Sequence, residues 1–180
     1  MQNLASPALQ AEDVAVLQAI VSQYDVLESR WSQVAAVCNR MPQTLEHGDF
    51  TERHVRFRRI EQGAVLLPFD WETAGWGSPA VDFAQFIVDS VSPHISTYLS
   101  VVRPVWPHLD VQDLKQLASI GTIFRVMNSI TWEQYGIVYD RWASCGLAYK
   151  CAQWTMHELR AYRTWLDDAL RAVQWGDENQ

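Results

Sequence analysis

Positive charge is scarce in this chain. Its 180 residues include 14 lysines and arginines against 21 aspartates and glutamates, which gives a formal net charge of -7. A protein that binds nucleic acid needs a positive footprint for the phosphates, so this balance argues against nucleic acid as a partner. Arg53, Arg56, Arg58 and Arg59 form a local basic cluster, which a solvated strand face explains more simply than a phosphate contact.

Cysteines and long apolar runs are also scarce. The chain has three cysteines, Cys38, Cys145 and Cys151. Their odd number and their spacing do not indicate a set of disulfide bonds, so we expect reduced thiols in a cytoplasmic protein. The spacing of Cys145, Cys151 and His157 does not stack on one helix face, which argues against zinc. No apolar run reaches the roughly 20 residues that span a bilayer. The first ten residues lack the basic and apolar regions of a secretion signal, so we expect no membrane partner.

Apolar residues recur every three or four positions over most of the chain, which is the pattern of helices with one buried stripe. Between residues 54 and 70 the period changes to alternation, and Glu61–Gly63 supplies a short turn with a glycine, which predicts a β-hairpin. Pro93, Pro104 and Pro107 are expected in loops. We therefore predict a mainly α protein with a small β-hairpin (α+β), a single domain over residues 1–180. The expected helices cover residues 11–37, 81–88, 111–129 with a break at Gly121, 137–154 and 157–173.

Two acidic residues flank this hairpin. Asp49 follows His47 and Gly48 in the loop before it, and Asp70 ends the return strand, so the hairpin is expected to bring Asp70 near His54. One carboxylate beside a substrate hydroxyl can accept its proton, and a second can hold a divalent cation against phosphate oxygens. Phosphoryl transfer requires both a group that positions and deprotonates the acceptor hydroxyl and a group that binds the metal.

Several segments together resemble the aminoglycoside phosphotransferase and choline kinase family. They are His47-Gly48-Asp49 with a ligand position five residues later, then "PFDWETAG", then "GSPAVDFA". The similarity covers about forty residues, Leu45 to Ala84, and any one piece alone would be weak. The resemblance implies the C-terminal, larger lobe of a protein-kinase-like fold. Its parts would be a catalytic loop at 45–55, a hairpin at 54–70 and a helical remainder at 80–175.

The family resemblance also implies roles for individual residues. The substrates would be ATP (or GTP) with Mg²⁺ and a small molecule that carries a hydroxyl. Asp49 would be the catalytic base, His47 would brace the loop, Asp70 would bind the metal and the nucleotide, and Asp82 would support the loop backbone. Further expected substrate contacts are Glu72, Glu133 and Trp132.

Two departures from the family pattern affect these expectations. The family has asparagine where this chain has His54, and a neutral imidazole is a poorer Mg²⁺ ligand than an amide oxygen. One expectation is that His54 is a metal and cofactor ligand that hydrogen-bonds to Asp49 or to a phosphate. The other is that His54 is a substitution at an inactive site. The segment before His47 also lacks the strands and the lysine of a smaller lobe. The chain would then be an excised fragment, one half of a split gene or a degenerate remnant. We expect the smaller lobe on another chain, or self-association through an exposed apolar surface. A non-catalytic ligand-binding or regulatory module is the alternative function.

Overall fold

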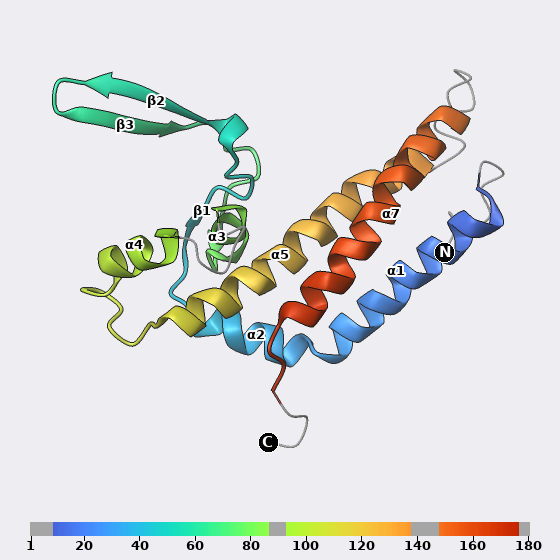
Figure 1. The fold of residues 1–180 in the computed structure, drawn as a ribbon, viewed down its shortest axis with the longest axis horizontal. Coiled ribbons are helices and arrows are strands. Elements are labelled where there is room, and N and C mark those ends of the chain that lie inside the picture. The colour runs from blue at the N-terminus through green and yellow to red at the C-terminus, as the bar shows by residue number, and fades with distance from the viewer. Residues whose placement is uncertain (1–8, 87–92, 138–147, 177–180) are drawn as a thin grey trace. The chain divides into compact units, whose positions relative to one another are not determined.

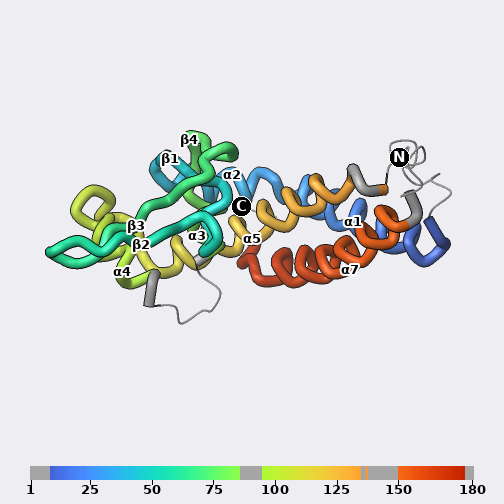
Figure 2. Tube along the Cα trace, turned by 90° about the horizontal axis from the view of Figure 1, so that it is seen from above, coloured from blue at the N-terminus to red at the C-terminus, as the bar shows by residue number. Residues whose placement is uncertain are grey.

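The computed structural model describes residues 9–86, 93–137 and 148–176 (Figures 1 and 2). The chain divides into two compact units. The first, which we call the helical unit, comprises Met1–Ser32 and Ile123–Ala172, and the second, the loop unit, comprises Gln33–Thr122 and Val173–Gln180. Helix α2 (Trp31–Asn39) and helix α5 (Val111–Glu133) each begin in one unit and end in the other.

The helical unit consists of α1 (Ala11–Ser29), the second part of α5, the 3-10 turn η3 (Gln134–Ile137) and α7 (Ala148–Ala172). Helices α1 and α7 lie side by side in both views (Figures 1 and 2). Ile20 of α1, Ile137 of η3, and Met156 and Leu159 of α7 form a buried apolar cluster. The three-to-four-residue spacing of apolar side chains on each helix is what makes this shared face possible.

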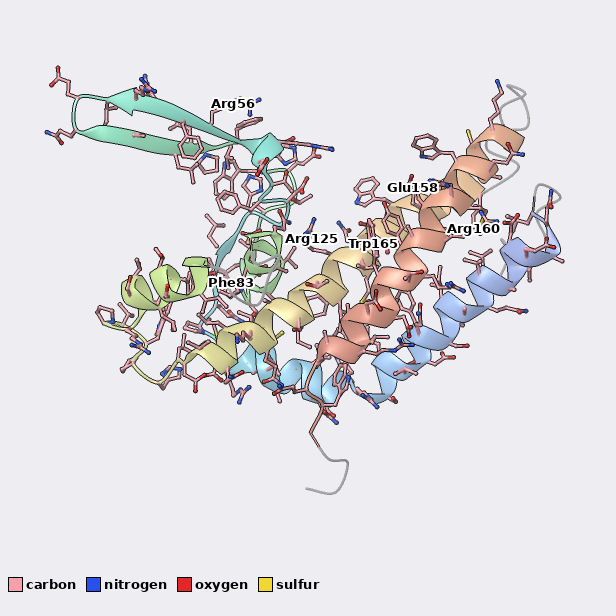
Figure 3. The ribbon with its side chains drawn as sticks, viewed as in Figure 1. Arg56, Phe83, Arg125, Glu158, Arg160 and Trp165 are labelled. Carbon is pink, nitrogen blue, oxygen red and sulfur yellow. The ribbon has the colours of Figure 1, made fainter. Side chains whose placement is uncertain are left out.

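Asp13 secures the beginning of α1. Its carboxylate accepts a hydrogen bond from the Gln10 backbone N–H at 3.0 Å, which occupies one of the donors that every helix start leaves unpaired. The same carboxylate is ion-paired with Arg160, which reaches from α7 toward the start of α1 (Figure 3). Asp13 is buried, so this pairing compensates the cost of removing its charge from water.

The loop unit combines two small antiparallel sheets with helices. One sheet pairs β1 (Thr44–Glu46) with β4 (Gly75–Gly77), and the other pairs β2 (Val55–Ile60) with β3 (Gly63–Pro68). The helices are the later part of α2, α3 (Ala80–Phe86), α4 (Pro93–Val102) and the first part of α5, and η2 (Glu52–His54) is a 3-10 turn. Leu114, Leu117 and Ile120 of α5 are fully buried and mark the core of this unit.

The predicted hairpin is present. Strand β2 pairs with β3 from Val55 opposite Pro68 to Ile60 opposite Gly63, and Gly63 adopts a φ of +138° at the turn. Most side chains of both strands are exposed, and Phe57 is 74% exposed. The hairpin therefore exposes several apolar side chains to solvent.

Three sequence-based expectations about the elements were wrong, and one pair of strands was not anticipated. The helix expected over 11–37 is two helices, because the Arg30 N–H bonds to Leu27 O at 3.1 Å and the backbone leaves the helical region there. Helix α4 begins at Pro93, where we expected a loop, because proline has no N–H to lose in the first turn. The β1–β4 pair was not anticipated, because three-residue strands carry almost no periodic signal. Helix α5 continues through Gly121, where we expected a break.

The remaining expected helices correspond in part to observed ones. Helix α3 covers the described part of 81–88, and α7 includes both 148–154 and 157–172. Positions 87–88 and 138–147, with Cys145, lie outside the described residues. Cys38 and Cys151 are free thiols. Over the described ranges, no helix combines the length and the apolar character that crossing a membrane would take.

Gly121 marks a close approach of two helices within the loop unit. A Cβ at this position would overlap the Ala80 carbonyl at the start of α3 and would lie 2.9 Å from the Ala84 Cβ. The glycine thus lets α5 approach α3, the helix that carries Asp82.

We expect Gly121→Ala to destabilise the protein although alanine is the better helix former. Helix propensity favours alanine by about 1 kcal/mol, whereas forcing an extra methyl group into packed structure costs about 1–3 kcal/mol and moves the backbone. Urea unfolding followed by circular dichroism measures the net effect. Asn128→Ala, at an exposed position of the same helix, is the control and should not lower the midpoint. A Gly121→Ala variant as stable as that control would show that α5 does not pack closely on α3.

Candidate functional site

The loop that follows β1 turns sharply at Gly48. Its φ is +81°, a region that side chains with a Cβ rarely adopt. A Cβ there would also lie 2.6 Å from the Thr73 carbonyl oxygen. The Thr73 hydroxyl in turn donates to the His47 carbonyl at 2.9 Å. Only glycine permits the loop to pass this close to the segment after β3, which explains why His-Gly-Asp has glycine at its centre.

Asp82 holds the same loop from its other side. Its two carboxylate oxygens accept hydrogen bonds from consecutive backbone groups, the His47 N–H at 2.5 Å and the Gly48 N–H at 2.8 Å. Asp82 lies in the first turn of α3, so a short helix carries the carboxylate to the loop. Hydrogen bonds to a charged acceptor are stronger than neutral ones, and two of them fix both position and direction of the peptide planes.

His47 is buried and connects the loop to the end of the hairpin. Its Nε2 lies 2.8 Å from the Phe69 carbonyl oxygen. A carbonyl can only accept, so Nε2 carries a proton and donates it to this oxygen. Among the described residues Nδ1 has no hydrogen-bond partner, and the ring centroid lies 4.6 Å from that of Trp71. These contacts hold His47 inside the structure, away from a solvent-facing position.

His54 lies between the two acidic residues that the sequence singled out. Its Nδ1 is 3.2 Å from the Asp49 carboxylate and its Nε2 is 3.5 Å from the Asp70 carboxylate. Nδ1 also lies 2.9 Å from the Asp49 backbone oxygen. The Phe69 N–H donates to the His54 carbonyl at 3.0 Å, which closes the base of the hairpin beside these groups. Asp49 and Asp70 therefore approach one imidazole from opposite sides.

Asp70 has an unusual backbone conformation. Its φ of +67° is the only positive value among the described residues other than glycine. Aspartate tolerates this region better than most residues, but the conformation is still strained, and such residues concentrate at functional sites. The turn directs a carboxylate that is 46% exposed toward His54. Asp49 is exposed to a similar degree, so solvent or a ligand can reach both groups.

The donor groups fit a magnesium ion only in part. Mg²⁺ is usually held by one or two carboxylates, with water and phosphate oxygens completing the shell, and the half-exposed Asp70 carboxylate suits that role. His54 offers nitrogen, which Mg²⁺ takes less readily. Across the described residues, no three His, Cys, Asp or Glu side chains are arranged to hold a metal by themselves. A cation here would need water or phosphate oxygens as further ligands.

The other predicted substrate residues are not brought to this site by the described contacts. Glu72 is exposed and follows Trp71 after the hairpin. Trp132, 65% exposed, and Glu133 lie at the end of α5 in the helical unit. The Glu133 carboxylate accepts a hydrogen bond from the Thr155 hydroxyl at 3.1 Å within that unit.

Sequence reasoning missed Glu46. This residue ends β1, directly before His47, and burial followed by the negative charge of Asp82 raises the pKa of its carboxyl to about 7. A Cβ at position 77 would overlap its Oε1, so Gly77 leaves room for the carboxyl. The sequence carries no signal for this environment, because it arises from the unpredicted β1–β4 pairing.

We expect Glu46 to make the protein less stable as the pH rises. Its folded-state pKa of about 7 exceeds the ordinary value of 4.5, so the folded chain keeps a proton that the unfolded chain loses between these values. The stabilisation is complete below about 4.5 and is lost as the pH rises through about 7. Glu46→Gln should flatten the decline of the urea midpoint between pH 5 and pH 8, whereas Glu28→Gln, at an exposed site, should leave it unchanged. Identical pH profiles for Glu46→Gln and the wild type would contradict this assignment.

The comparison with family models agrees with the geometry. The model described as "Phosphotransferase enzyme family" matches residues 2–120, which include the loop, the hairpin and α3. No curated protein and no solved structure gave a match. The matched span exceeds half of the chain, and the match implies a kinase-like fold. This chain therefore belongs to the phosphotransferase enzyme family.

Proposed function

We propose that the chain carries the catalytic loop of an ATP-dependent phosphotransferase that acts on a hydroxyl of a small molecule. The observation that carries this proposal is the position of His54 between the Asp49 and Asp70 carboxylates. The proposed base, Asp49, and the proposed metal ligand, Asp70, thus lie beside the same imidazole, and each is about half exposed. In this proposal the chain, residues 1–180, is the larger lobe of a kinase-like fold.

In the proposed reaction Asp49 orients the acceptor hydroxyl and takes its proton. The hydroxyl oxygen forms a bond to the γ-phosphorus while the bond from that phosphorus to the β,γ-bridging oxygen breaks, and ADP leaves with the electron pair. Asp70 would hold the metal that accompanies the nucleotide, and Mg²⁺ when bound would neutralise charge on the phosphate oxygens. Asp82 and His47 keep the loop in place, so that little reorganisation is needed at the moment of transfer.

His54 is best suited to hold Asp49 rather than to bind Mg²⁺. Its Nδ1 already faces Asp49 through both the backbone oxygen and the carboxylate. Its Nε2 faces Asp70, so a cation that binds Asp70 must displace or share this contact. The same imidazole that positions the base thus competes with the metal.

A non-catalytic module is the second candidate, and the hairpin favours it. Phe57 is 74% exposed and Ile60 47% exposed, while Leu66 and Leu67 of β3 are each about 40% exposed. Phe57 and Leu66 lie opposite each other in the register and so share one face of the hairpin, and exposed apolar side chains that share a face commonly mark a surface that another protein covers. The covering partner would be a second polypeptide that supplies a smaller lobe, or another copy of this chain. A chain that must first acquire a partner could bind a ligand or regulate that partner without turning over a substrate.

We expect the wild-type protein to bind ATP in the presence of Mg²⁺ or Mn²⁺, and Asp70→Ala to lose this binding by roughly tenfold or more, since a carboxylate ligand to the metal is removed. Isothermal titration calorimetry measures both. Asp168→Ala, which removes one exposed acid from α7, is the matched control for the change in net charge and should bind normally. A wild-type protein that binds no nucleotide at any metal concentration would support the non-catalytic module instead.

We expect His54→Asn to bind Mg²⁺ more tightly than the wild type. The substitution replaces an imidazole nitrogen by an amide oxygen, which is the harder ligand, and removes the competing contact with Asp70. Titration of Mg²⁺ at a fixed ATP concentration gives the midpoint for each variant. An unchanged midpoint would show that His54 does not limit metal binding.

A further inference from the structure

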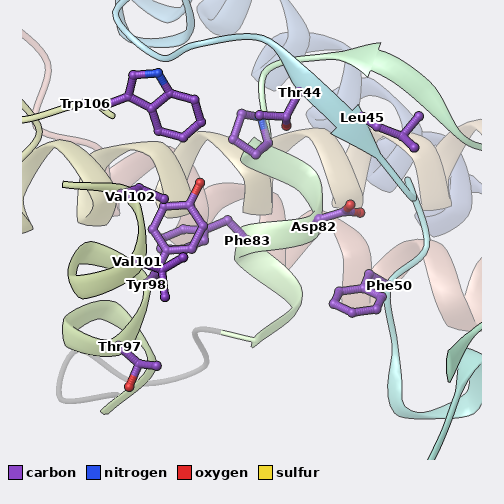
Figure 4. A pocket seen from close by; sticks show the side chains of 11 residues that line it. Thr44, Leu45, Phe50, Asp82, Phe83, Thr97, Tyr98, Val101, Val102 and Trp106 are labelled. Atoms are coloured by element: carbon purple, nitrogen blue, oxygen red, sulfur yellow. The ribbon is translucent and has the colours of Figure 1, made fainter. Parts of the chain in front are cut away.

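A cavity of about 600 Å³ lies against the catalytic loop, entirely within the loop unit (Figure 4). This size is within the roughly 300–1,000 Å³ range of sites that bind small molecules. The walls come from β1, the loop after it, α3, α4 and the turn after α4. The described lining residues are Thr44, Leu45, Phe50, Pro79, Asp82, Phe83, Thr97, Tyr98, Val101, Val102 and Trp106.

Aromatic rings dominate the walls of this cavity. Phe83 and Tyr98 meet edge to face, with ring centroids 4.8 Å apart at 63°. In Figure 4 these two rings and the indole of Trp106 gather on one side, and Phe50 lies on the other side of Asp82. Burial raises the pKa of the Tyr98 phenol, so it stays protonated at neutral pH and can donate one hydrogen bond. The surface that a ligand would meet is therefore aromatic and largely apolar, with few polar groups.

Among its described lining residues the cavity offers no positive charge to a ligand. Asp82 is the only charged side chain there, and both of its oxygens already accept the His47 and Gly48 N–H groups. An anion that moved from water into such surroundings would lose hydration, gain no counter-ion and lie near the negative charge of Asp82. An uncharged ligand suffers no such loss, so the lining favours it over an anion.

The cavity is also built on the loop that carries the proposed base. Phe50 lines it and directly follows Asp49 in the chain. Asp82 lines it as well, and the same side chain fixes the two residues that precede Asp49. A molecule in the cavity thus lies against the segment that positions Asp49.

We propose that this cavity binds an uncharged small molecule with a flat aromatic or alicyclic body and, on the basis of the proposed function, that this molecule is the phosphoryl acceptor. Its apolar body packs against Phe83, Tyr98 and Trp106, and its hydroxyl extends along the loop to Asp49. The reaction is the transfer already described, with the proton of this hydroxyl passing to Asp49 and the γ-phosphoryl group to its oxygen.

The binding part is tested with two fluorescent probes that share one ring system, neutral N-phenyl-1-naphthylamine and anionic 8-anilinonaphthalene-1-sulfonate. The neutral probe should saturate one site and bind roughly tenfold more tightly than the anion, because the anion loses hydration without a partner. Equal binding of the two probes, or no saturable binding of the neutral one, would overturn the proposal.

Substitutions at two equally exposed valines, of which only one lines the cavity, test where the probe binds. Val101 lines the cavity and is 71% exposed, and Val105 is 70% exposed and does not line it. Val101→Asp introduces a charge that the bound probe would cover, so affinity for the neutral probe should fall by roughly tenfold. Val105→Asp should leave the affinity within about twofold, because exposed substitutions away from a site have small effects. Equal losses in both variants would place the probe elsewhere.

The acceptor part is tested with 2-(1-naphthyl)ethanol, a neutral alcohol with the same ring body. Mass spectrometry should detect its phosphate ester in the presence of ATP and Mg²⁺, and the ester should be absent with Asp49→Ala and reduced with Val101→Asp. Neutral-probe binding needs no nucleotide and should persist in Asp70→Ala.

If the probe binds but ATP does not, the cavity assignment stands and the proposed function fails. If ATP binds but the neutral probe does not, the proposed function stands and the cavity assignment fails. If both bind and no ester forms, the acceptor assignment alone is overturned.

Discussion

The contact between the Asp82 carboxylate and two backbone N–H groups is the interaction on which the site depends. The loop after β1 must turn through a left-handed glycine, and such a turn leaves backbone donors without partners in regular structure. Asp82 supplies both missing acceptors from the first turn of a short helix. Because α3 in turn packs closely on Gly121 of α5, the position of the loop is tied to the core of its unit.

The geometry of the acidic residues follows from this anchor. With His47 fixed, its Nε2 can hold the Phe69 carbonyl, and the chain then enters the strained turn at Asp70. The hairpin returns Asp70 to the side of His54 that Asp49 does not occupy. The arrangement destabilises the charged form of Glu46. Its carboxyl is half-buried and lies beside the negative charge of Asp82, and these two effects raise its pKa. A stability disadvantage of this kind is tolerated where a charge is needed for another purpose.

The sequence predicted the parts of this site that depend on local spacing. The hairpin could be recognised from the alternation of Val55 and Phe57 with Arg56 and Arg58 and from Gly63 at the turn, and the structure contains it. The roles assigned to Asp49, Asp70 and Asp82 remain predictions, although the contacts of all three suit those roles. The β1–β4 pair, the environment of Glu46 and the cavity at Phe50 could not be read from the sequence. They arise where segments about thirty to sixty residues apart pair, as Thr44 does with Gly77, or line one cavity, as Leu45 and Trp106 do. The break at Arg30 was missed for another reason, since the apolar spacing continues across it.

The most direct test of this account is the amide hydrogen exchange of His47 and Gly48, measured by nuclear magnetic resonance in the wild type and in Asp82→Asn. Because an asparagine side chain has one acceptor oxygen in place of two, at least one of the two N–H groups loses its partner. The account predicts slow exchange of both amides in the wild type and much faster exchange in the variant, with the amides of α5 unaffected. Exchange of both wild-type amides at the rate of an unstructured loop, or no difference between the two proteins, would contradict it.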